Sequence, residues 1–184
     1  MQYKLTTPCA AEDLAMLRAG DTVLLSGIVY TARDAAHKRM CEALDAGETL
    51  PFDLTGSAVY YVGPTPEKPG QIIGSAGPTT SGRMDAYSPR LLDLGNKIMI
   101  GKGKRDAAVK EAVVRNGAVY VAALGGAGAL MCQCVKSLEV IAWPDLGCEA
   151  VRQLEVEDMP LTVILDSQGG DLYESGPSAY LQSL

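Results

Sequence analysis

Apolar runs alternate with amphipathic stretches along the first half of the chain. The run DTVLLSGIVY (21–30) is rich in β-formers, which predicts a buried strand. The stretch TARDAAHKRMCEALDAG (31–47) follows it and has helical character. Thr31 is placed to cap this helix, Asp34 stands where a capping box has its acid, and Gly47 ends it. A strand that leads directly into a helix is the repeating unit of an α/β fold.

The same pattern continues toward the C-terminus. Further strands are predicted at 57–63, 71–77, 96–101 and 118–124, and helices at about 83–94, 105–115 and 125–135. The last third is mostly strand, with predicted strands at 138–143, 150–158 and 161–166. We therefore expect one α/β domain over residues 1–184 with a mixed central sheet, ending in a loose polar tail at about 175–184.

The composition fits a globular protein and narrows its partners. Of 184 residues, 47% are hydrophobic and 21% are charged, and the formal net charge is −6. An acidic chain argues against nucleic-acid binding, which normally needs a basic face. No stretch reaches the roughly 18 uninterrupted apolar residues of a membrane span. The N-terminal MQYKLTTPCA lacks the apolar run of a signal peptide, so we expect no membrane partner and a cytoplasmic location.

Neither the cysteines nor the glycines form a familiar cofactor motif. The five cysteines are odd in number and irregularly spaced, which suits structural thiols in a reducing compartment. Cys132 and Cys134 are two positions apart, and no second pair completes a zinc site, so we expect this chain to bind no metal. GNKIMIGKGK has Gly after Lys102, where a phosphate loop has Ser or Thr, and GGAGAL lacks the full dinucleotide spacing.

Three cations follow predicted strands, at or near the start of predicted helices: Arg33, Arg83 and Lys102. In α/β folds, ligands bind outside the carboxyl ends of the strands. Two arginines and a lysine suit a small dicarboxylate, because guanidinium binds carboxylate in a bidentate way. Solvated surface charge is the open alternative. His37 lies one turn after Arg33 on the same helical face, where a packing role is favoured over a catalytic one.

The stretch GSAGPTTSGRMD (74–85) places several hydroxyls beside Arg83. Thr79, Thr80 and Ser81 are positioned to cap the following helix, to donate hydrogen bonds to an anion, or to do both. The glycines of this stretch let a ligand approach the backbone closely. A loop that only reversed the chain would not need so many donors beside a cation.

Several long motifs carry a family resemblance. SGIVYTARDAAHKRM, YYVGPTPEKPG…GSAGPTTSGRMD, MIGKG and GGAGAL…LGCEAVRQLEVEDMP occur in this order over roughly residues 3–174. Together they resemble the β subunit of class I iron–sulfur hydro-lyases, the family of fumarate hydratase and L-tartrate dehydratase. The resemblance implies a swivelling β/β/α domain that closes over a [4Fe-4S] cluster. In this family a separate α subunit holds that cluster, so none of the five cysteines here is expected to be a ligand.

The resemblance also assigns roles to the residues already singled out. Arg33, Arg83 and Lys102 match the family's substrate-carboxylate binders, the same trio that strand placement brings forward. Thr79 matches a residue placed at the substrate carbon and implicated in proton transfer, and Thr80 is expected to contact the bound substrate. No metal ligand is assigned to this chain.

The expected function is therefore the reversible hydration of fumarate to L-malate by an enzyme of α and β subunits, assembled as a dimer of α–β pairs. The motif SGRMDAY favours fumarate, while L-tartrate or a mesaconate-type substrate stays open. A stand-alone anion-binding or scaffold domain is the non-enzyme alternative. The isolated chain is expected to be inactive, because half of the site, including the iron, would be missing.

Overall fold

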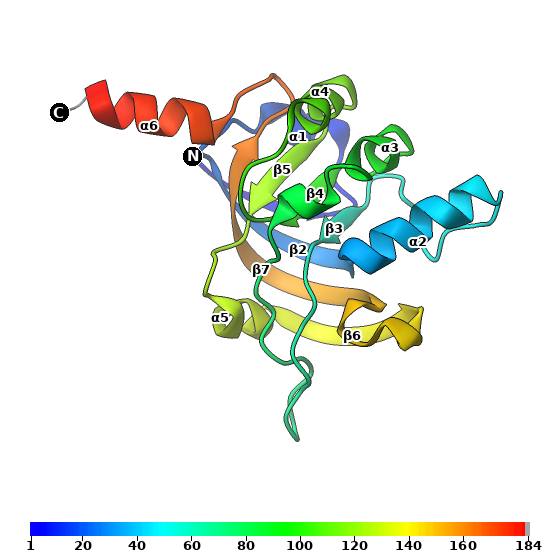
Figure 1. Cartoon of the computed structure of the whole chain (residues 1–184). Helices are drawn as coiled ribbons and strands as arrows, with labels where there is room; N and C mark the ends of the chain where they lie inside the picture. Colours follow the sequence, from blue (N-terminus) through cyan, green and yellow to red (C-terminus); the bar gives the residue numbers. More distant parts are fainter. Residues whose placement is uncertain (183–184) are drawn as a thin grey trace.

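Five parallel strands form the centre of the molecule in a computed structural model that describes residues 1–182 (Figure 1). In spatial order they are β1 (Gln2–Thr7), β2 (Thr22–Thr31), β3 (Ala58–Tyr60), β4 (Ile98–Gly101) and β5 (Val119–Ala122). Two antiparallel strands follow them, β6 (Val135–Ala142) and β7 (Val151–Leu165). The α/β class with a mixed central sheet is thus confirmed.

The sheet closes on itself through β7. This strand pairs antiparallel with β5 at one end of the parallel series and with β2 near the other, so β2, β3, β4, β5 and β7 form a ring. Val29 pairs with Leu154 on one side of the ring, and Val121 pairs with Val163 on the other. Apolar residues of alternate positions fill the interior of the ring, among them Tyr60.

The opposite face of the parallel strands lies under helices. These are α2 (Asp34–Asp45), α3 (Ser88–Asp93) and α4 (Ala107–Arg115), with the short helix η1 (Ser81–Met84) between α2 and α3 along the chain. A second core joins these helices to the sheet, and Tyr61, Met99 and Tyr120 belong to it. Figure 1 shows α2, α3 and α4 on one side of the sheet. The side chains of β3 and β4 therefore alternate between two apolar cores.

Three further helices lie outside this pattern. They are α1 (Ala11–Met16), α5 (Gly128–Gln133) and α6 (Leu172–Gln182), and a 3-10 segment, η2 (Pro144–Glu149), precedes β7. Helix α6 occupies most of the segment expected to be a loose tail and projects from the body (Figure 1). The last two residues of that expected tail, 183–184, lie outside the described part of the chain. Within residues 1–182, no helix has the length and apolarity needed to cross a membrane.

The predicted helix at 31–47 is confirmed as α2, but its cap is not the one expected. Arg33 is the N-cap residue and its own side chain does not cap the helix, while the Glu149 carboxylate accepts from the Ala35 amide in the first turn at 2.9 Å. The Thr31 hydroxyl instead donates to the Ala150 carbonyl at 3.3 Å and accepts from the Arg152 amide at 3.0 Å. The Thr31 hydroxyl therefore bonds to the chain at the start of β7, which pairs with β2, and is not available to the capping box.

The predicted strand at 71–77 is wrong. Residues 64–76, which come after β3 and before β4 along the chain, form a two-armed projection, hereafter the finger. It extends to the bottom of Figure 1. Its arms bond to each other, with the Thr65 amide donating to the Ser75 carbonyl at 3.1 Å. The Ala76 amide donates to Gly128 of α5, not to a sheet neighbour. A β-carbon on Gly74 would overlap the Thr65 carbonyl oxygen, so glycine is what lets the arms meet.

The two predicted strands at 150–158 and 161–166 are one strand. Strand β7 runs for 15 residues through Pro160, which stands opposite Leu24 of β2. The register of β2 and β7 shifts between Leu25 and Gly27, and Asp158 adopts a φ of 47° near this irregularity. Pairing with β2 resumes at Met159 beyond this irregularity, so the strand continues where two separate strands were predicted.

Candidate functional site

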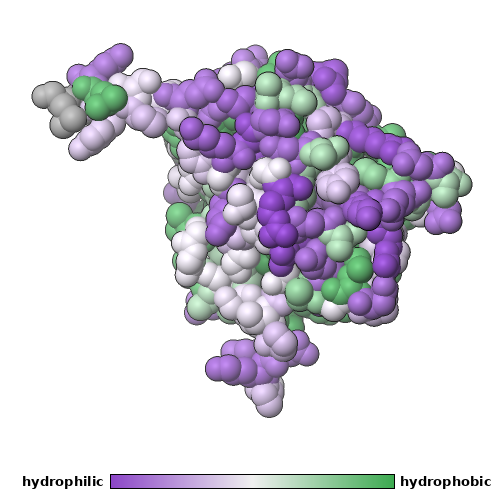
Figure 2. Space-filling model, in the orientation of Figure 1, coloured by the Kyte–Doolittle hydropathy of each residue, from purple (hydrophilic) through white to green (hydrophobic). Residues whose placement is uncertain are grey.

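The carboxyl ends of the parallel strands meet at one edge of the sheet, and the three cations lie there. Arg33 lies two residues after the end of β2 as the N-cap of α2, Lys102 follows β4 directly, and Arg83 lies in η1. Figure 2 shows hydrophilic side chains gathered at the centre of the corresponding face, over the region that β3, β4 and α2 occupy in Figure 1. Residues from Arg33 to Lys102, 69 positions apart in the sequence, thus contribute charge to one edge.

Asp34 connects the two arginines. Its Oδ1 lies 2.7 Å from Arg83 Nε, and its Oδ2 lies 3.6 Å from Arg33 Nη2. Glu149 Oε1 lies 3.5 Å from the same Arg33 nitrogen. Arg83 is 54% exposed, and its Nε makes the contact with Asp34. Within residues 1–182 neither terminal nitrogen of that guanidinium forms a hydrogen bond, so both are available to a carboxylate.

The Arg33–Asp34 pair is incomplete as it stands. Arg33 Nε and Asp34 Oδ2 are both buried, and neither has a hydrogen-bond partner among the described residues. Buried polar groups are nearly always hydrogen-bonded, and an orphan calls for a missing water or ligand. Close packing holds Arg33 here, since a β-carbon on Gly63 would stand only 2.8 Å from Arg33 Nη1. This edge therefore has the polar character of a binding site.

Lys102 is tied to the hydroxyl-rich loop through its backbone. Thr80 and Lys102 form an isolated parallel bridge. The Ser81 amide donates to the Lys102 carbonyl at 2.8 Å, and the Lys102 amide donates to Ser81 Oγ at 3.0 Å. A β-carbon on Gly101 would overlap Ser81 Oγ, so glycine at the end of β4 permits this contact. The Lys102 side chain passes Gly125, and its ammonium has no ion-pair partner in the described chain.

Thr79 and Thr80 keep their hydroxyls free. The Thr79 amide donates to the Tyr61 carbonyl at 2.7 Å, which places this residue beside the end of β3. Thr80 is exposed and is the N-cap residue of η1, yet no side chain caps that helix. The capping role considered for Thr79, Thr80 and Ser81 is therefore wrong. Within residues 1–182 neither threonine hydroxyl has a hydrogen-bond partner, so both remain available to a ligand.

The three cations were predicted at or near the start of helices, and this holds for one of them. The predicted helix at 83–94 is divided into η1 and α3, with Pro89 in the first turn of α3. Lys102 lies five residues before α4 begins at Ala107. Only Arg33 stands at the start of a helix of full length. Side-chain charge, more than helix dipoles, is thus what this edge offers to an anion.

His37 packs under the arginines and does not reach a ligand. It is 1% exposed, its ring lies edge-on to Tyr61 with centroids 5.2 Å apart, and its Nδ1 donates to the Arg33 carbonyl at 3.0 Å. Burial is the main cause that lowers the pKa of His37 to about 4. The hydrogen bond to Arg33 opposes that shift, and the Arg105 guanidinium adds to it. The packing interpretation of this histidine is the one its burial supports.

The lowered pKa of His37 predicts acid sensitivity. Between pH 6.5 and about 4, the unfolded chain binds a proton at His37 that the folded chain does not, so the free energy of unfolding falls as the pH falls. At about pH 5 the expected loss from this group is about 2 kcal/mol. Urea unfolding at neutral and mildly acidic pH measures it. His37→Gln removes the chain's one histidine and should flatten this slope, whereas equal slopes in both proteins would contradict the assignment.

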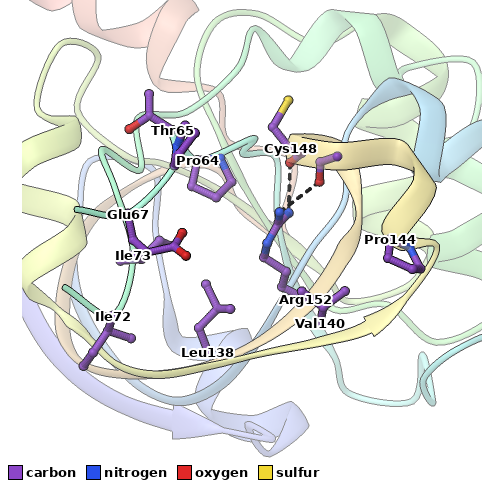
Figure 3. Close-up of a pocket in the computed structure, with 12 residues that line it drawn as sticks. Pro64, Thr65, Glu67, Ile72, Ile73, Leu138, Val140, Pro144, Cys148 and Arg152 are labelled. Carbon is purple, nitrogen blue, oxygen red and sulfur yellow. Dashed lines mark hydrogen bonds between the residues drawn. The ribbon is translucent and has the colours of Figure 1, made fainter. Parts of the chain in front are cut away.

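A cavity of about 460 Å³ lies beside this edge, between the finger and η2 (Figure 3). Ile72, Leu138 and Val140 give it apolar walls, and Arg152 points into it. The Arg152 guanidinium is already occupied, since it donates to the carbonyls of Gly147, Cys148 and Ala150 at 2.9–3.0 Å. None of the predicted site residues lines this cavity. The cavity and the three cations are therefore separate candidates for a ligand site.

No metal-binding group is evident in the described chain. Within residues 1–182, no three or more His, Cys, Asp or Glu side chains are grouped so that they could hold a metal ion. All five cysteines are free thiols, and burial raises the pKa of Cys9, Cys41 and Cys134. Four of the five thiols are partly buried, and Cys148 is exposed.

Comparison with known proteins identifies relatives over nearly the whole chain. Residues 1–176 match the family described as Fumarase C-terminus. Fumarate hydratase 2 of Leishmania major is 38% identical over 168 residues, covering 88% of this chain and 29% of the relative. The aerobic class I fumarate hydratase of Escherichia coli (strain K12) is 40% identical over 152 residues, covering 82% of this chain and 28% of the relative.

A third relative has nearly the length of this chain. The putative L(+)-tartrate dehydratase subunit beta of Methanocaldococcus jannaschii is 40% identical over 169 residues, covering 89% of this chain and 87% of the relative. The chain thus spans less than a third of the two fumarate hydratases and most of the tartrate dehydratase subunit.

Proposed function

The chain belongs to the Fumarase C-terminus family, and from this membership we propose that it is the β subunit of a class I hydro-lyase that hydrates fumarate to L-malate. One observation carries the proposal beyond the family: Arg33, Arg83 and Lys102 lie along one sheet edge beside the free hydroxyl of Thr79. The orphaned Arg33 Nε and the unpaired ends of Arg83 and Lys102 suit a doubly charged substrate.

The cations would act on the carboxylates. The planar guanidinium of Arg83 donates two parallel hydrogen bonds to one carboxylate, while the Lys102 ammonium acts as a point charge. Loss of a proton from the carbon next to a carboxylate shifts negative charge onto that carboxylate. Fixed cations stabilise this charge more in the transition state than in the ground state, which is what accelerates a reaction.

Thr79 would move the proton at the substrate carbon. A threonine hydroxyl is far too weak an acid to ionise at neutral pH, so it needs a second group to share or accept its proton. Among residues 1–182 no carboxylate bonds to the Thr79 hydroxyl, and we assign the second group to the partner subunit. Thr80, exposed and adjacent, supplies a further hydroxyl to the bound substrate.

The partner is an α subunit that carries the [4Fe-4S] cluster. The described residues of this chain provide no ligand set for such a cluster. The name of the Methanocaldococcus relative, a subunit beta, supports a two-chain arrangement. We further propose that the enzyme assembles as a dimer of α–β pairs and works in the cytoplasm, whose reducing conditions suit five free cysteines.

L-Tartrate is the second candidate substrate. The tartrate dehydratase relative matches this chain over nearly its full length at an identity equal to that of the Escherichia coli fumarate hydratase. A cation trio recognises two carboxylates in either substrate and does not discriminate between them. Mesaconate, the third candidate, has one methyl group more than fumarate. The non-enzyme alternative, a scaffold domain, would have no use for the free Thr79 hydroxyl.

The proposal is tested by anaerobic co-expression of this chain with its α subunit, followed by assays on fumarate, L-tartrate and mesaconate. We expect turnover of fumarate by the pair and none by this chain alone. Preferred turnover of L-tartrate would correct the substrate and keep the reaction class. Turnover by the single chain, or a reconstituted pair that acts on none of the three, would contradict the proposal.

A further inference from the structure

Two buried tyrosines enclose a buried arginine beneath the site. The Arg105 guanidinium lies over the rings of Tyr61 and Tyr120, at 5.3 Å and 5.0 Å from their centroids. Its Nε donates to Asp85 Oδ1 at 2.6 Å, and its Nη2 donates to Ser88 Oγ at 2.7 Å. The Arg105 side chain has no exposed surface. Tyr61 and Tyr120 are equally buried, at 1% and 0% exposure, on neighbouring parts of one core.

The two tyrosine hydroxyls have different partners. The Tyr120 hydroxyl lies 2.9 Å from Ser81 Oγ and 2.9 Å from the Gly103 carbonyl oxygen. The Tyr61 hydroxyl lies 3.2 Å from Ser88 Oγ, which is its one hydrogen-bond partner within residues 1–182. Only Tyr120 therefore bonds to the two turns that carry the site.

Each partner of Tyr120 is next in sequence to a residue of the site. Ser81 follows Thr80, and Gly103 follows Lys102. Ser81 Oγ accepts a hydrogen bond from the Lys102 amide at 3.0 Å, so one serine oxygen bonds to both Tyr120 and Lys102. The Tyr120 hydroxyl thus closes a ring of contacts that fixes the two turns relative to each other. Buried networks of this kind, when fully satisfied, fix a single geometry.

We propose that Tyr120 is a positioning residue for the dicarboxylate site, acting through Ser81 to hold Thr80 and Lys102 in binding geometry. This inference rests on the proposed function and adds to it a residue that lies on β5, below the site. Tyr120 touches no substrate. A displacement of about 1 Å in a positioned group is enough to reduce the rate of an enzyme severely.

Tyr120→Phe in the assembled α–β enzyme tests the inference, with Tyr61→Phe as its matched control. Both variants keep the ring over Arg105 and lose one buried hydroxyl, so their losses of thermal stability should be similar. Only Tyr120→Phe frees Ser81 and Gly103. We expect it to raise KM for the substrate and Kd for succinate, an unreactive dicarboxylate, by about tenfold, and Tyr61→Phe to leave both nearly unchanged.

Two further measurements keep the test decisive. Ser81→Ala breaks the same ring from the other side and should weaken succinate binding similarly, and the effects of Tyr120→Phe and Ser81→Ala together should fall short of their sum. Amide hydrogen exchange over 79–83 and 101–105 should accelerate in Tyr120→Phe and not in Tyr61→Phe. Equal effects of the two tyrosine variants on succinate binding, in an enzyme whose wild type is active, would overturn the inference and leave the proposed function intact. A wild-type pair inactive on every dicarboxylate would refute the proposed function, whereas the exchange result would still report on the positioning.

Discussion

Thr79→Val in the assembled enzyme is expected to lower kcat by about 10²–10⁴-fold, the range that general acid–base groups contribute. Valine has nearly the shape of threonine and removes only the hydroxyl. That hydroxyl has no hydrogen-bond partner among the described residues, and the bond from the Thr79 amide to the Tyr61 carbonyl is unaffected. The melting temperature should therefore change little. Steady-state kinetics together with a thermal melt measure both effects.

Thr79→Ser and Thr80→Val are the matched controls. Serine restores a hydroxyl at the same position and should recover most of the lost kcat. Thr80→Val removes the neighbouring hydroxyl, which is assigned to substrate contact and not to proton transfer, so its effect should fall mainly on KM. If Thr79→Val keeps a normal kcat, the proton-transfer role of Thr79 is wrong.

Arg83→Lys is expected to reduce kcat/KM by about tenfold to a hundredfold, because a hydrogen bond to a charged group contributes about 1.5–3 kcal/mol. Lysine keeps the charge and loses the planar fork, so two parallel contacts with a carboxylate become one. If the carboxylate gains charge in the transition state, kcat falls along with the rise in KM. Arg83 is 54% exposed, so the change should have little effect on folding.

Arg90→Lys controls for the loss of a guanidinium fork elsewhere on the surface. Arg90 is 43% exposed and pairs with Asp45 through Nη1 at 2.7 Å, much as Arg83 pairs with Asp34. It lies away from the strand ends, at α3. Its kinetics should match the wild type. Near-normal kcat/KM for Arg83→Lys together with a sharply lower melting temperature would make Arg83 a structural residue.

The sequence predicts the strand–helix alternation well, because buried parallel strands and the helices that cover them have strong local patterns. The strand at 21–30 and the helix at 31–47 appear nearly as expected, as β2 and α2. The segment at 71–77 has the same apolar character as a strand, but its backbone bonds to the other arm of the finger and to Gly128 of α5 and not to a neighbouring strand. Local pattern does not reveal which partner a segment will find.

The site is predictable where residue type and strand ends coincide, and not where it depends on contacts distant in sequence. Arg33 and Lys102 are found by their placement after strands. Asp34 joins two arginines, although its sequence position suggests only a capping role. Its neighbour Arg33 is the one sequence feature that points to this ion pair. Tyr120 contacts Ser81 across 39 positions, and no motif marks that pairing.

The most direct test of the account is the structure of the assembled α–β enzyme with a bound dicarboxylate, such as L-malate. We predict carboxylate oxygens within about 3 Å of the guanidinium nitrogens of Arg33 and Arg83 and of the Lys102 ammonium, with the Thr79 hydroxyl facing the substrate carbon. A dicarboxylate bound instead in the cavity beside the finger, with those three cations left in solvent, would contradict the account.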